Sequence, residues 1–129
     1  MIPVIIYSIL HGKKIPIYGD GMNRRDWLSV SDHCRGIELV MKGGKPGEIY
    51  NIGGGTELTN LELARKILEI MGANDESLSY VPDRKGHDHR YAVSIEKIKN
   101  DLGYLPIKTL DDSLVAIIEW YKENPKWWG

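Results

Sequence analysis

Residues 83–91, which read DRKGHDHRY, pack two arginines, a lysine and two histidines into one short segment. Two aspartates in the segment can orient these cations, and Gly86 lets the backbone turn. The planar fork of an arginine matches the paired oxygens of a phosphate, and each sheltered hydrogen bond of this kind contributes roughly 1.5–3 kcal/mol. The segment therefore predicts an anion site, with a diphosphate as the first candidate. The alternative is an ordinary solvated charged loop.

The composition of the rest of the chain is that of a globular domain. The 129 residues are 42% hydrophobic and 27% charged, which predicts one modest core and a single domain over residues 1–129. The formal net charge of -1 leaves no broad basic field. We therefore expect neither nucleic acid nor a membrane as a partner, and any anion site must be local.

The N-terminal segment and the single cysteine bear on cellular location. Cys34 is the single cysteine, so it cannot form an internal disulfide, which favours a cytoplasmic location. We expect Cys34 to be a small buried residue of a helix and not a nucleophile. Residues 1–10 are apolar but too short to cross a bilayer. They also lack a basic leader and a small-residue cleavage site, so we expect no signal peptide.

Apolar spacing and turn residues predict an α/β chain of helices with a few short strands. Helices are expected over residues 2–10, after Ser31, after a capping box of Thr59 and Glu62, after Ser94 and after Thr109. The helix after Ser31 should bury a stripe of Cys34, Ile37, Val40 and Met41. Strands are expected over residues 14–18, 25–30, 48–52 and 78–81. At least one of Trp127 and Trp128 should pack against the body of the protein.

Motifs of a reaction centre are not evident, and we expect no catalytic residue. The sequence contains neither G-x-S-x-G nor H-E-x-x-H. Glycines 53–55 lack the spacing of a phosphate loop and indicate a tight turn. His87 and His89 would share one face of a strand and could bind a metal, but no third ligand is evident. We therefore expect no metal site.

Six segments together resemble the dTDP-glucose 4,6-dehydratase family, a member of the extended short-chain dehydrogenase/reductase group. They are residues 16–21 (PIYGDG), 25–28 (RDWL), 30–33 (VSDH), 47–54 (GEIYNIGG), 83–92 (DRKGHDHRYA) and 102–106 (LGYLP). The likeness runs over nearly the whole chain. The RDWL segment is shared with nucleotide-sugar epimerases, whereas residues 83–92 joined to YNIGG point to the dTDP-glucose enzymes.

The resemblance implies a site for the dTDP part of a nucleotide sugar such as dTDP-glucose. Residues that correspond to the stretch along thymine and deoxyribose are Pro16, Ile17 and Tyr18. Arg25 corresponds to an arginine that holds the diphosphate, and Asn60 to an asparagine near the nucleotide. The loop over the phosphates corresponds to Asp83, Arg84, Lys85, Gly86 and His87. Lys85 stands where the family usually has a proline. The lysine adds a positive charge and makes the loop less rigid.

The resemblance also implies that this chain is the C-terminal, substrate-binding portion of such an enzyme, a fragment or a stand-alone relic. In the family, the NAD-binding Rossmann half and the catalytic residues precede this portion. We therefore expect no bound NAD in this chain, although NAD serves the complete enzyme. Alone, the chain should not convert dTDP-glucose to dTDP-4-keto-6-deoxyglucose.

The missing half also bears on assembly and on the alternatives. Family dimers form largely through helices of that half, so we expect no family-type dimer. Exposed apolar residues, among them those of segment 2–9, could instead drive self-association. Two other functions stay open: the same portion of a related nucleotide-sugar epimerase or reductase, and a non-catalytic binding or assembly module.

Overall fold

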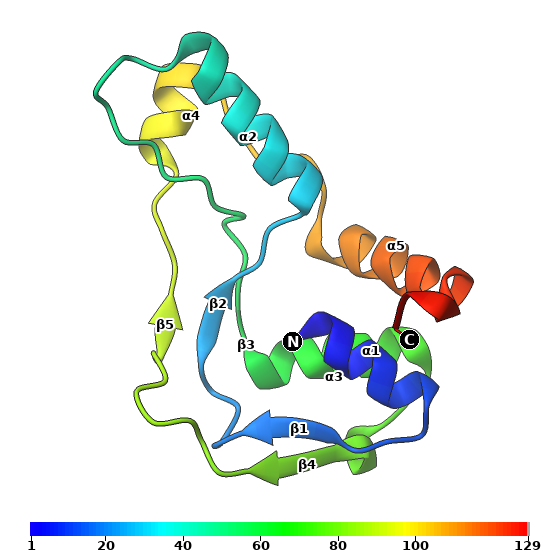
Figure 1. Cartoon of the computed structure of the whole chain (residues 1–129). Helices are drawn as coiled ribbons and strands as arrows, with labels where there is room; N and C mark the ends of the chain where they lie inside the picture. The colour runs from blue at the N-terminus through cyan, green and yellow to red at the C-terminus, as the bar shows by residue number, and fades with distance from the viewer. Residues whose placement is uncertain (129) are drawn as a thin grey trace.

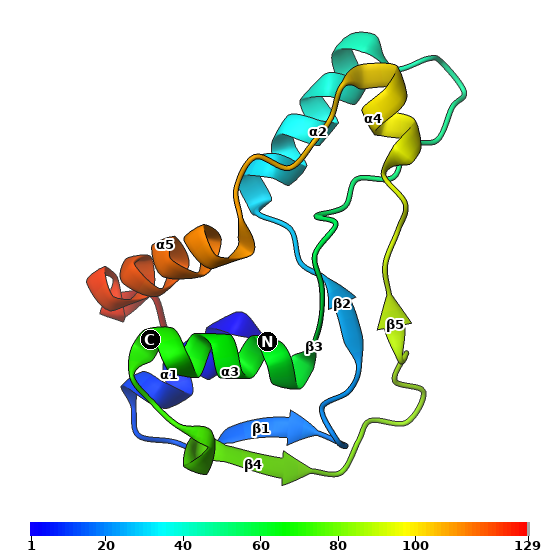
Figure 2. The same ribbon diagram turned by 180° about the vertical axis from the view of Figure 1, so that it is seen from behind.

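The computed structural model describes residues 1–128, with Trp128 described through its backbone alone. The elements in chain order are α1 (Ile2–Leu10), β1 (Ile15–Tyr18), β2 (Arg24–Asp26), α2 (Val30–Gly43), β3 (Glu57–Thr59), α3 (Asn60–Met71), η1 (Asp75–Ser77), β4 (Leu78–Val81), β5 (Arg90–Tyr91), α4 (Glu96–Leu102), α5 (Leu110–Glu123) and η2 (Pro125–Trp128). Helices α1, α3 and α5 gather with β1 and β4 at one end, which we call the body (Figure 1). Helices α2 and α4 lie side by side at the other end, which we call the arm (Figure 2).

The body is built around one apolar cluster. Helices α1 and α5 both pack on α3, and the parallel pair β1–β4 adjoins them. The buried members of the cluster are Ile5, Ile6, Ile15, Ile17, Leu63, Ala64, Ile67, Leu68, Leu114, Ile118 and Tyr121. The spacing of apolar residues therefore correctly predicted α1 and α5, and the strands that end at Tyr18 and Val81.

The predicted capping box at the start of α3 is confirmed. The Thr59 Oγ1 accepts a hydrogen bond from the Glu62 amide at 3.1 Å, and the Glu62 carboxylate accepts one from the Thr59 amide at 2.7 Å. The helix ends at Gly72, whose φ of 69° lies in the left-handed region that glycine tolerates. Thr59 is also the last residue of β3, so the cap places the helix directly on the sheet.

A small sheet joins the body to the arm, with β2 at its centre. Strand β2 pairs antiparallel with β3 and parallel with β5, which brings Arg25 opposite Leu58 on one side and Tyr91 on the other. The basic segment 83–91 leaves the end of β4 and enters β5, and thus connects the two sheets (Figure 1). It turns at Gly86, whose φ is +70°.

Two strand predictions were wrong, one in its extent and the other in its existence. The strand expected over 25–30 ends at Asp26, and α2 begins at Val30 after Ser29 instead of after Ser31. Residues 48–52 form no strand, and Glu57–Thr59 pairs with β2 in their place. The reason lies in Asp26, whose carboxylate accepts hydrogen bonds from the amides of Gly54 (3.0 Å) and Thr56 (3.1 Å). A Cβ on Gly54 would collide with the Trp27 carbonyl, so the glycines serve this close approach.

The buried stripe predicted for α2 was also wrong. Met41 is 82% exposed, Ile37 is 42% exposed, and Cys34 is exposed as well. The helix instead buries Asp32 and Gly36. Asp32 is drawn inward because its carboxylate accepts hydrogen bonds from the backbone amides that precede α5.

The remaining helix starts and the C-terminus follow the sequence more closely. Helix α4 starts at Glu96, whose amide donates to the Ser94 hydroxyl at 3.4 Å, and α5 is capped by Thr109 as predicted. Trp127 meets the Trp120 ring edge-on at 5.3 Å, whereas the Trp128 side chain lies outside the described residues. None of the helices in residues 1–128 has the length and apolar character needed to span a membrane.

Candidate anion-binding site

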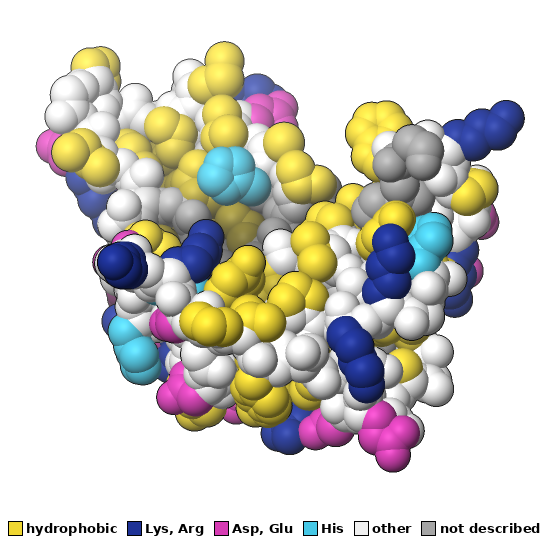
Figure 3. All heavy atoms as spheres, turned by 60° about the horizontal axis from the view of Figure 1, so that its bottom comes forward, with side chains coloured by type: hydrophobic (Ala, Val, Ile, Leu, Met, Phe, Trp, Pro, Cys, Tyr) yellow, Lys and Arg dark blue, Asp and Glu magenta, His cyan; other side chains and the backbone are white. Residues whose placement is uncertain are grey.

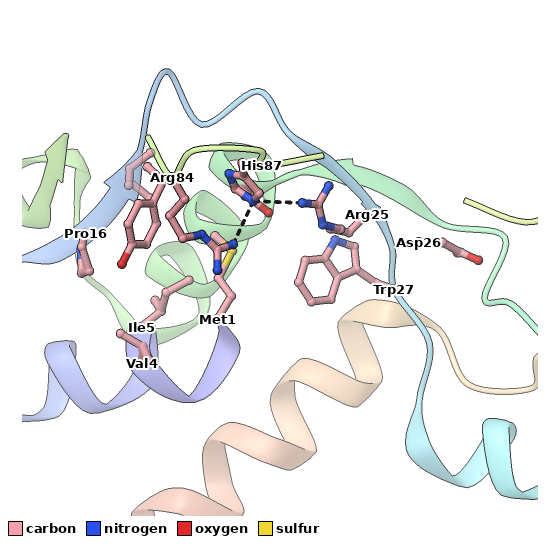
Figure 4. Close-up of a pocket in the computed structure, with 12 residues that line it drawn as sticks. Met1, Val4, Ile5, Pro16, Arg25, Asp26, Trp27, Arg84 and His87 are labelled. Atoms are coloured by element: carbon pink, nitrogen blue, oxygen red, sulfur yellow. Dashed lines mark hydrogen bonds between the residues drawn. The ribbon is translucent and has the colours of Figure 1, made fainter. Parts of the chain in front are cut away.

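A pocket of about 490 Å³ opens between α1, the end of β1, β2 and the basic segment (Figure 4). Its lining residues are Met1, Val4, Ile5, Pro16, Ile17, Tyr18, Arg25, Asp26, Trp27, Asn60, Arg84 and His87. Seven of the ten residues predicted from the sequence are in this set. Segments far apart in the sequence therefore converge on one pocket.

Two arginines meet at one histidine on the rim of the pocket. The Nη2 atom of Arg25 lies 3.0 Å from His87 Nε2, and the Nη2 atom of Arg84 lies 2.9 Å from the same nitrogen. Figure 4 shows both guanidiniums turned toward the imidazole, one from β2 and one from the basic segment. The other ring nitrogen, His87 Nδ1, lies 2.7 Å from the Asp83 carboxylate. The His87 side chain is only 7% exposed.

Aromatic rings and backbone carbonyls hold the two arginines from behind. The Arg25 guanidinium lies 4.5 Å from the Tyr91 ring centre, and that of Arg84 lies 5.3 Å from the Tyr18 ring centre. Such cation–π contacts restrain a guanidinium without neutralising it. Arg25 also donates to the carbonyls of Arg24 at 2.6 Å and Asp88 at 3.0 Å. No carboxylate of the described residues forms an ion pair with either arginine under a 4.0 Å limit.

Three predicted residues, Asp83, Lys85 and Gly86, lie beside the pocket and do not line it. Asp83 instead acts on His87, and the hydrogen bond from the imidazole, together with the Arg84 amide, holds the pKa of the Asp83 carboxyl below its usual range. Lys85 and Gly86 line an adjoining hollow of about 310 Å³ that shares Arg25, Arg84 and His87 with the main pocket. A ligand could therefore reach Arg25 and Arg84 from either of the two hollows.

Sequence reasoning missed five lining residues: Met1, Val4, Ile5, Asp26 and Trp27. The RDWL segment was a signal for two of them, because Asp26 and Trp27 directly follow Arg25. Asp26 points away from the cations in Figure 4, in keeping with its hydrogen bonds to Gly54 and Thr56. The residues of α1 carry no polar signal. Only the packing of α1 beside β1 brings them to the pocket.

Other possible reactive groups have structural explanations. Tyr104 and Lys108 have the Tyr-x-x-x-Lys spacing, which sequence reasoning overlooked. Tyr104 is fully buried, however, and its hydroxyl donates to the Gly53 carbonyl at 3.1 Å. His87 lies in a loop and not on a strand, and no cluster of three potential metal ligands occurs among residues 1–128.

The chain is similar to known proteins in sequence and in fold. The model of a family described as GDP-mannose 4,6 dehydratase matches residues 1–116. The dTDP-glucose 4,6-dehydratase of Streptomyces niveus is 52% identical over 99% of this chain and 38% of its own length. The structure of the dTDP-glucose 4,6-dehydratase DesIV of Streptomyces venezuelae, with NAD bound, has a TM-score of 0.94 and 49% identity over 97% of this chain and 39% of its own.

An epimerase is similar as well. The UDP-glucose 4-epimerase of Thermotoga maritima, solved with UDP-glucose, has a TM-score of 0.90 and 31% identity over 96% of this chain and 40% of its own. The first curated relatives are matched over 38% to 40% of their length, so the chain spans well under half of each. The comparisons confirm the predicted resemblance and the predicted fold class.

Proposed function

The chain belongs to the GDP-mannose 4,6 dehydratase family, and from this premise we propose that it is the substrate-binding part of a dTDP-glucose 4,6-dehydratase. In this proposal the chain holds the dTDP moiety of the nucleotide sugar. The observation that carries the proposal is the meeting of Arg25 and Arg84 at one nitrogen on the rim of the pocket. Two guanidiniums this close repel each other, so an anion between them is strongly favoured.

A diphosphate suits this arrangement better than a single carboxylate does. The two arginines approach from different segments, and each has donors left over after its contact with His87. Adjacent phosphates offer oxygens in both directions, and Arg–phosphate hydrogen bonds are among the stronger ones in proteins. Asn60, at the first position of α3, adds an amide on the body side of the pocket.

The apolar side of the pocket suits a flat base. Pro16, Ile17 and Tyr18 line the pocket from β1. Met1 and Val4 line it from α1 and the residue before that helix (Figure 4). A nucleobase is a thin, largely apolar disc with a polar rim, and such walls together with backbone groups of a strand can hold it. We propose that the base lies here, with the diphosphate toward the arginines.

Cofactor chemistry is not assigned to this chain. The G-x-G-x-x-G turn that holds the pyrophosphate of NAD does not occur in the sequence, and the glycines at 53–55 support the Asp26 loop instead. These residues do not fit a dinucleotide. We propose that NAD and the catalytic groups belong to the remainder of a complete enzyme, and that this chain contributes binding and orientation of the substrate.

A second candidate is the equivalent part of a nucleotide-sugar epimerase. The similarity to the Thermotoga maritima UDP-glucose 4-epimerase favours it. The base separates the two candidates, because thymine carries a methyl group that uracil lacks. Preference for dTDP over UDP in a parallel titration supports the dehydratase. Equal or stronger binding of UDP favours the epimerase.

The experiment that tests the proposal is a titration of the chain with dTDP followed by amide NMR shifts. A partial site with two or three phosphate contacts should bind with a Kd of roughly 0.1–1 mM, equivalent to about -5 kcal/mol. We expect shifts at Tyr18, Arg25 and residues 84–87, and their loss in an Arg84→Ala variant. Arg65→Ala is the matched control, because Arg65 pairs with Asp75 on the outer side of α3. Absence of shifts at several millimolar dTDP contradicts the proposal.

A further inference from the structure

The contacts of His87 determine which of its ring nitrogens carries the proton. An arginine side chain has five N–H donors and no acceptor. Both Arg25 and Arg84 place a donor within 3.0 Å of His87 Nε2, so this nitrogen must offer its lone pair. The proton of a neutral ring therefore sits on Nδ1, where it is donated to the Asp83 carboxylate at 2.7 Å. This is the less common tautomer of a free histidine, and Asp83 selects it.

We propose that His87 is the positioning residue of the anion site: its neutral ring holds the Arg25 and Arg84 guanidiniums together, and protonation of Nε2 releases them. The inference rests on the proposed function and deepens it, because it says what keeps two like charges in place before the diphosphate arrives. The ring acts through the arginines. The imidazole is the shared hydrogen-bond acceptor of the two guanidiniums, as a fixed water or a carboxylate could be. Unlike a carboxylate, a neutral imidazole leaves their positive charge available to the anion.

The surroundings of the ring support this role. The His87 side chain is nearly buried, and its contact with Arg25 is partly buried. The backbone also helps, because the His87 amide donates to the Arg84 carbonyl at 3.2 Å across the Gly86 turn. This turn places the side chains of Arg84 and His87 on the same side of the basic segment. Arg25 arrives from β2, whose partner strand β5 follows the basic segment directly.

The charged groups around the ring allow a pH response to be predicted. The guanidinium groups of Arg25 and Arg84 face the ring at Nε2. Asp83 stays ionised, because its pKa lies below the usual range for an aspartate. Tyr18 and Tyr91 face the arginines as neutral rings, and the Asp88 carboxylate is engaged by the Tyr91 hydroxyl. Met1 also lines the pocket, and burial lowers the pKa of its α-amino group.

Protonation of His87 has two opposing consequences that an experiment can separate. A cationic ring can no longer accept hydrogen bonds from the arginines and repels them, so the two guanidiniums would move apart. It would also add one positive charge, which by itself would attract the diphosphate. The inference requires the first effect to dominate, so that affinity falls as pH falls.

The first test is the ligand-free chain, observed through the imidazole ¹⁵N resonances of His87. A proton on Nδ1 with a bare Nε2 is the expected result. A proton on Nε2 overturns the inference, because the ring would then offer the two guanidiniums no acceptor. This measurement needs no ligand, so its outcome does not depend on the proposed function.

The second test is a titration with dTDP-glucose at several pH values. Its diphosphate is a diester and does not titrate in the range used, unlike the terminal phosphate of dTDP. We expect affinity to be about tenfold lower at about pH 5.5 than at about pH 8, because the proposed release of the arginines needs a proton that is more available at low pH. Affinity that rises over the same range overturns the inference.

Two substitutions of His87 separate positioning from folding. His87→Gln keeps an acceptor oxygen near the position of Nε2 but cannot be protonated. It should bind at pH 8 within about threefold of the unsubstituted chain and lose the pH response. His87→Ala removes the acceptor and should bind about tenfold more weakly, the equivalent of one hydrogen bond to a charged group. Equal weakening in both variants overturns the inference.

Two controls complete the design. The Gln variant retains the Met1 amino group, so a pH response that persists in it belongs to that group and contradicts the assignment to His87. His11→Gln changes a histidine that stacks on Tyr7 outside the pocket, and it should leave the titration unchanged. If the unsubstituted chain has the Nδ1 proton but binds no dTDP-glucose at pH 8, the proposed function fails while the positioning of the arginines stands.

Discussion

The body and the arm are built from helices of similar amphipathic pattern but hold together by different means. The helices of the body bury aliphatic side chains against one another, and Ile6, Ile67 and Ile118 are each fully buried. In the arm, α2 buries an aspartate and a glycine and leaves Met41 82% exposed. Helix α4 buries only Ile98. Apolar packing therefore stabilises the body, whereas hydrogen bonds contribute much of the stability of the arm.

The difference teaches that an apolar stripe predicts a helix but not the partner that covers it. The stripe of α2 is real in the sequence, yet Ile37 is half-exposed and Met41 is largely exposed. Hydrophobic side chains also gather in a hollow between two raised ends of the molecule (Figure 3). Substitutions in the body and in the arm should accordingly have very different effects.

The largest effect is expected in the body. Ile67→Ala removes a fully buried side chain from the cluster and should lower the free energy of unfolding by about 3 kcal/mol, through lost burial and the cavity left behind. Ile37→Ala, on the half-exposed face of α2, is the matched control and should cost less than about 1 kcal/mol. Urea unfolding of both variants measures the contrast. Equal losses would show that the arm is packed as tightly as the body.

A smaller but still substantial effect is expected at Asp32, the polar anchor of the arm. Its carboxylate accepts hydrogen bonds from the amides of Ile107 at 3.1 Å and Lys108 at 3.0 Å, and it pairs with Arg35. Asp32→Ala leaves these buried donors without a partner and should cost about 2 kcal/mol in the same unfolding experiment. A cost near zero would mean that water replaces the carboxylate.

The same residue predicts a pH dependence. Burial raises the pKa of Asp32, but the hydrogen bonds from Lys108, Ile107 and Arg35 outweigh it, so the folded-state pKa is lowered. The stabilisation is therefore present above the ordinary pKa of about 4 and is lost as pH falls through the lowered value. Unfolding at about pH 6 and about pH 3 should show a larger loss for the unsubstituted chain than for Asp32→Asn. A parallel loss in both would assign the acid sensitivity to other carboxylates.

The smallest effect on stability is expected on the exposed face of the arm. Met41→Gln should change the free energy of unfolding by less than about 0.5 kcal/mol, because the side chain is already in water. The Met41→Gln variant also tests whether the chain self-associates through this face. The sequence placed the apolar surface for self-association in residues 2–9, but Ile5 and Ile6 are buried, so the exposed stripe of α2 is the better candidate. Self-association in analytical ultracentrifugation that Met41→Gln reduces supports this, whereas a clean monomer at high concentration contradicts it.

The parts of the fold that sequence reasoning recovered are those with local causes. The capping box of Thr59 and Glu62 and the Thr109 cap of α5 act within a few residues. The parts that it missed depend on distant residues. A strand was expected over residues 48–52, but the Asp26 carboxylate holds the glycine loop that follows them, and they pair with no strand of residues 1–128.

The candidate site divides in the same way. Sequence alone determined that a basic segment with a turn at Gly86 exists, and family resemblance selected Arg25, Arg84 and His87, because residue chemistry and motif spacing are carried by the chain itself. Only the tertiary structure decided that both arginines share one imidazole nitrogen, and that α1 forms the apolar wall. The contact of Arg25 with His87 joins residues 62 apart in the sequence, and the pocket brings α1 together with residues of β1, β2 and the basic segment. Such contacts arise from the packing of β2 and β5 and of α1 and β1, which no local pattern specifies.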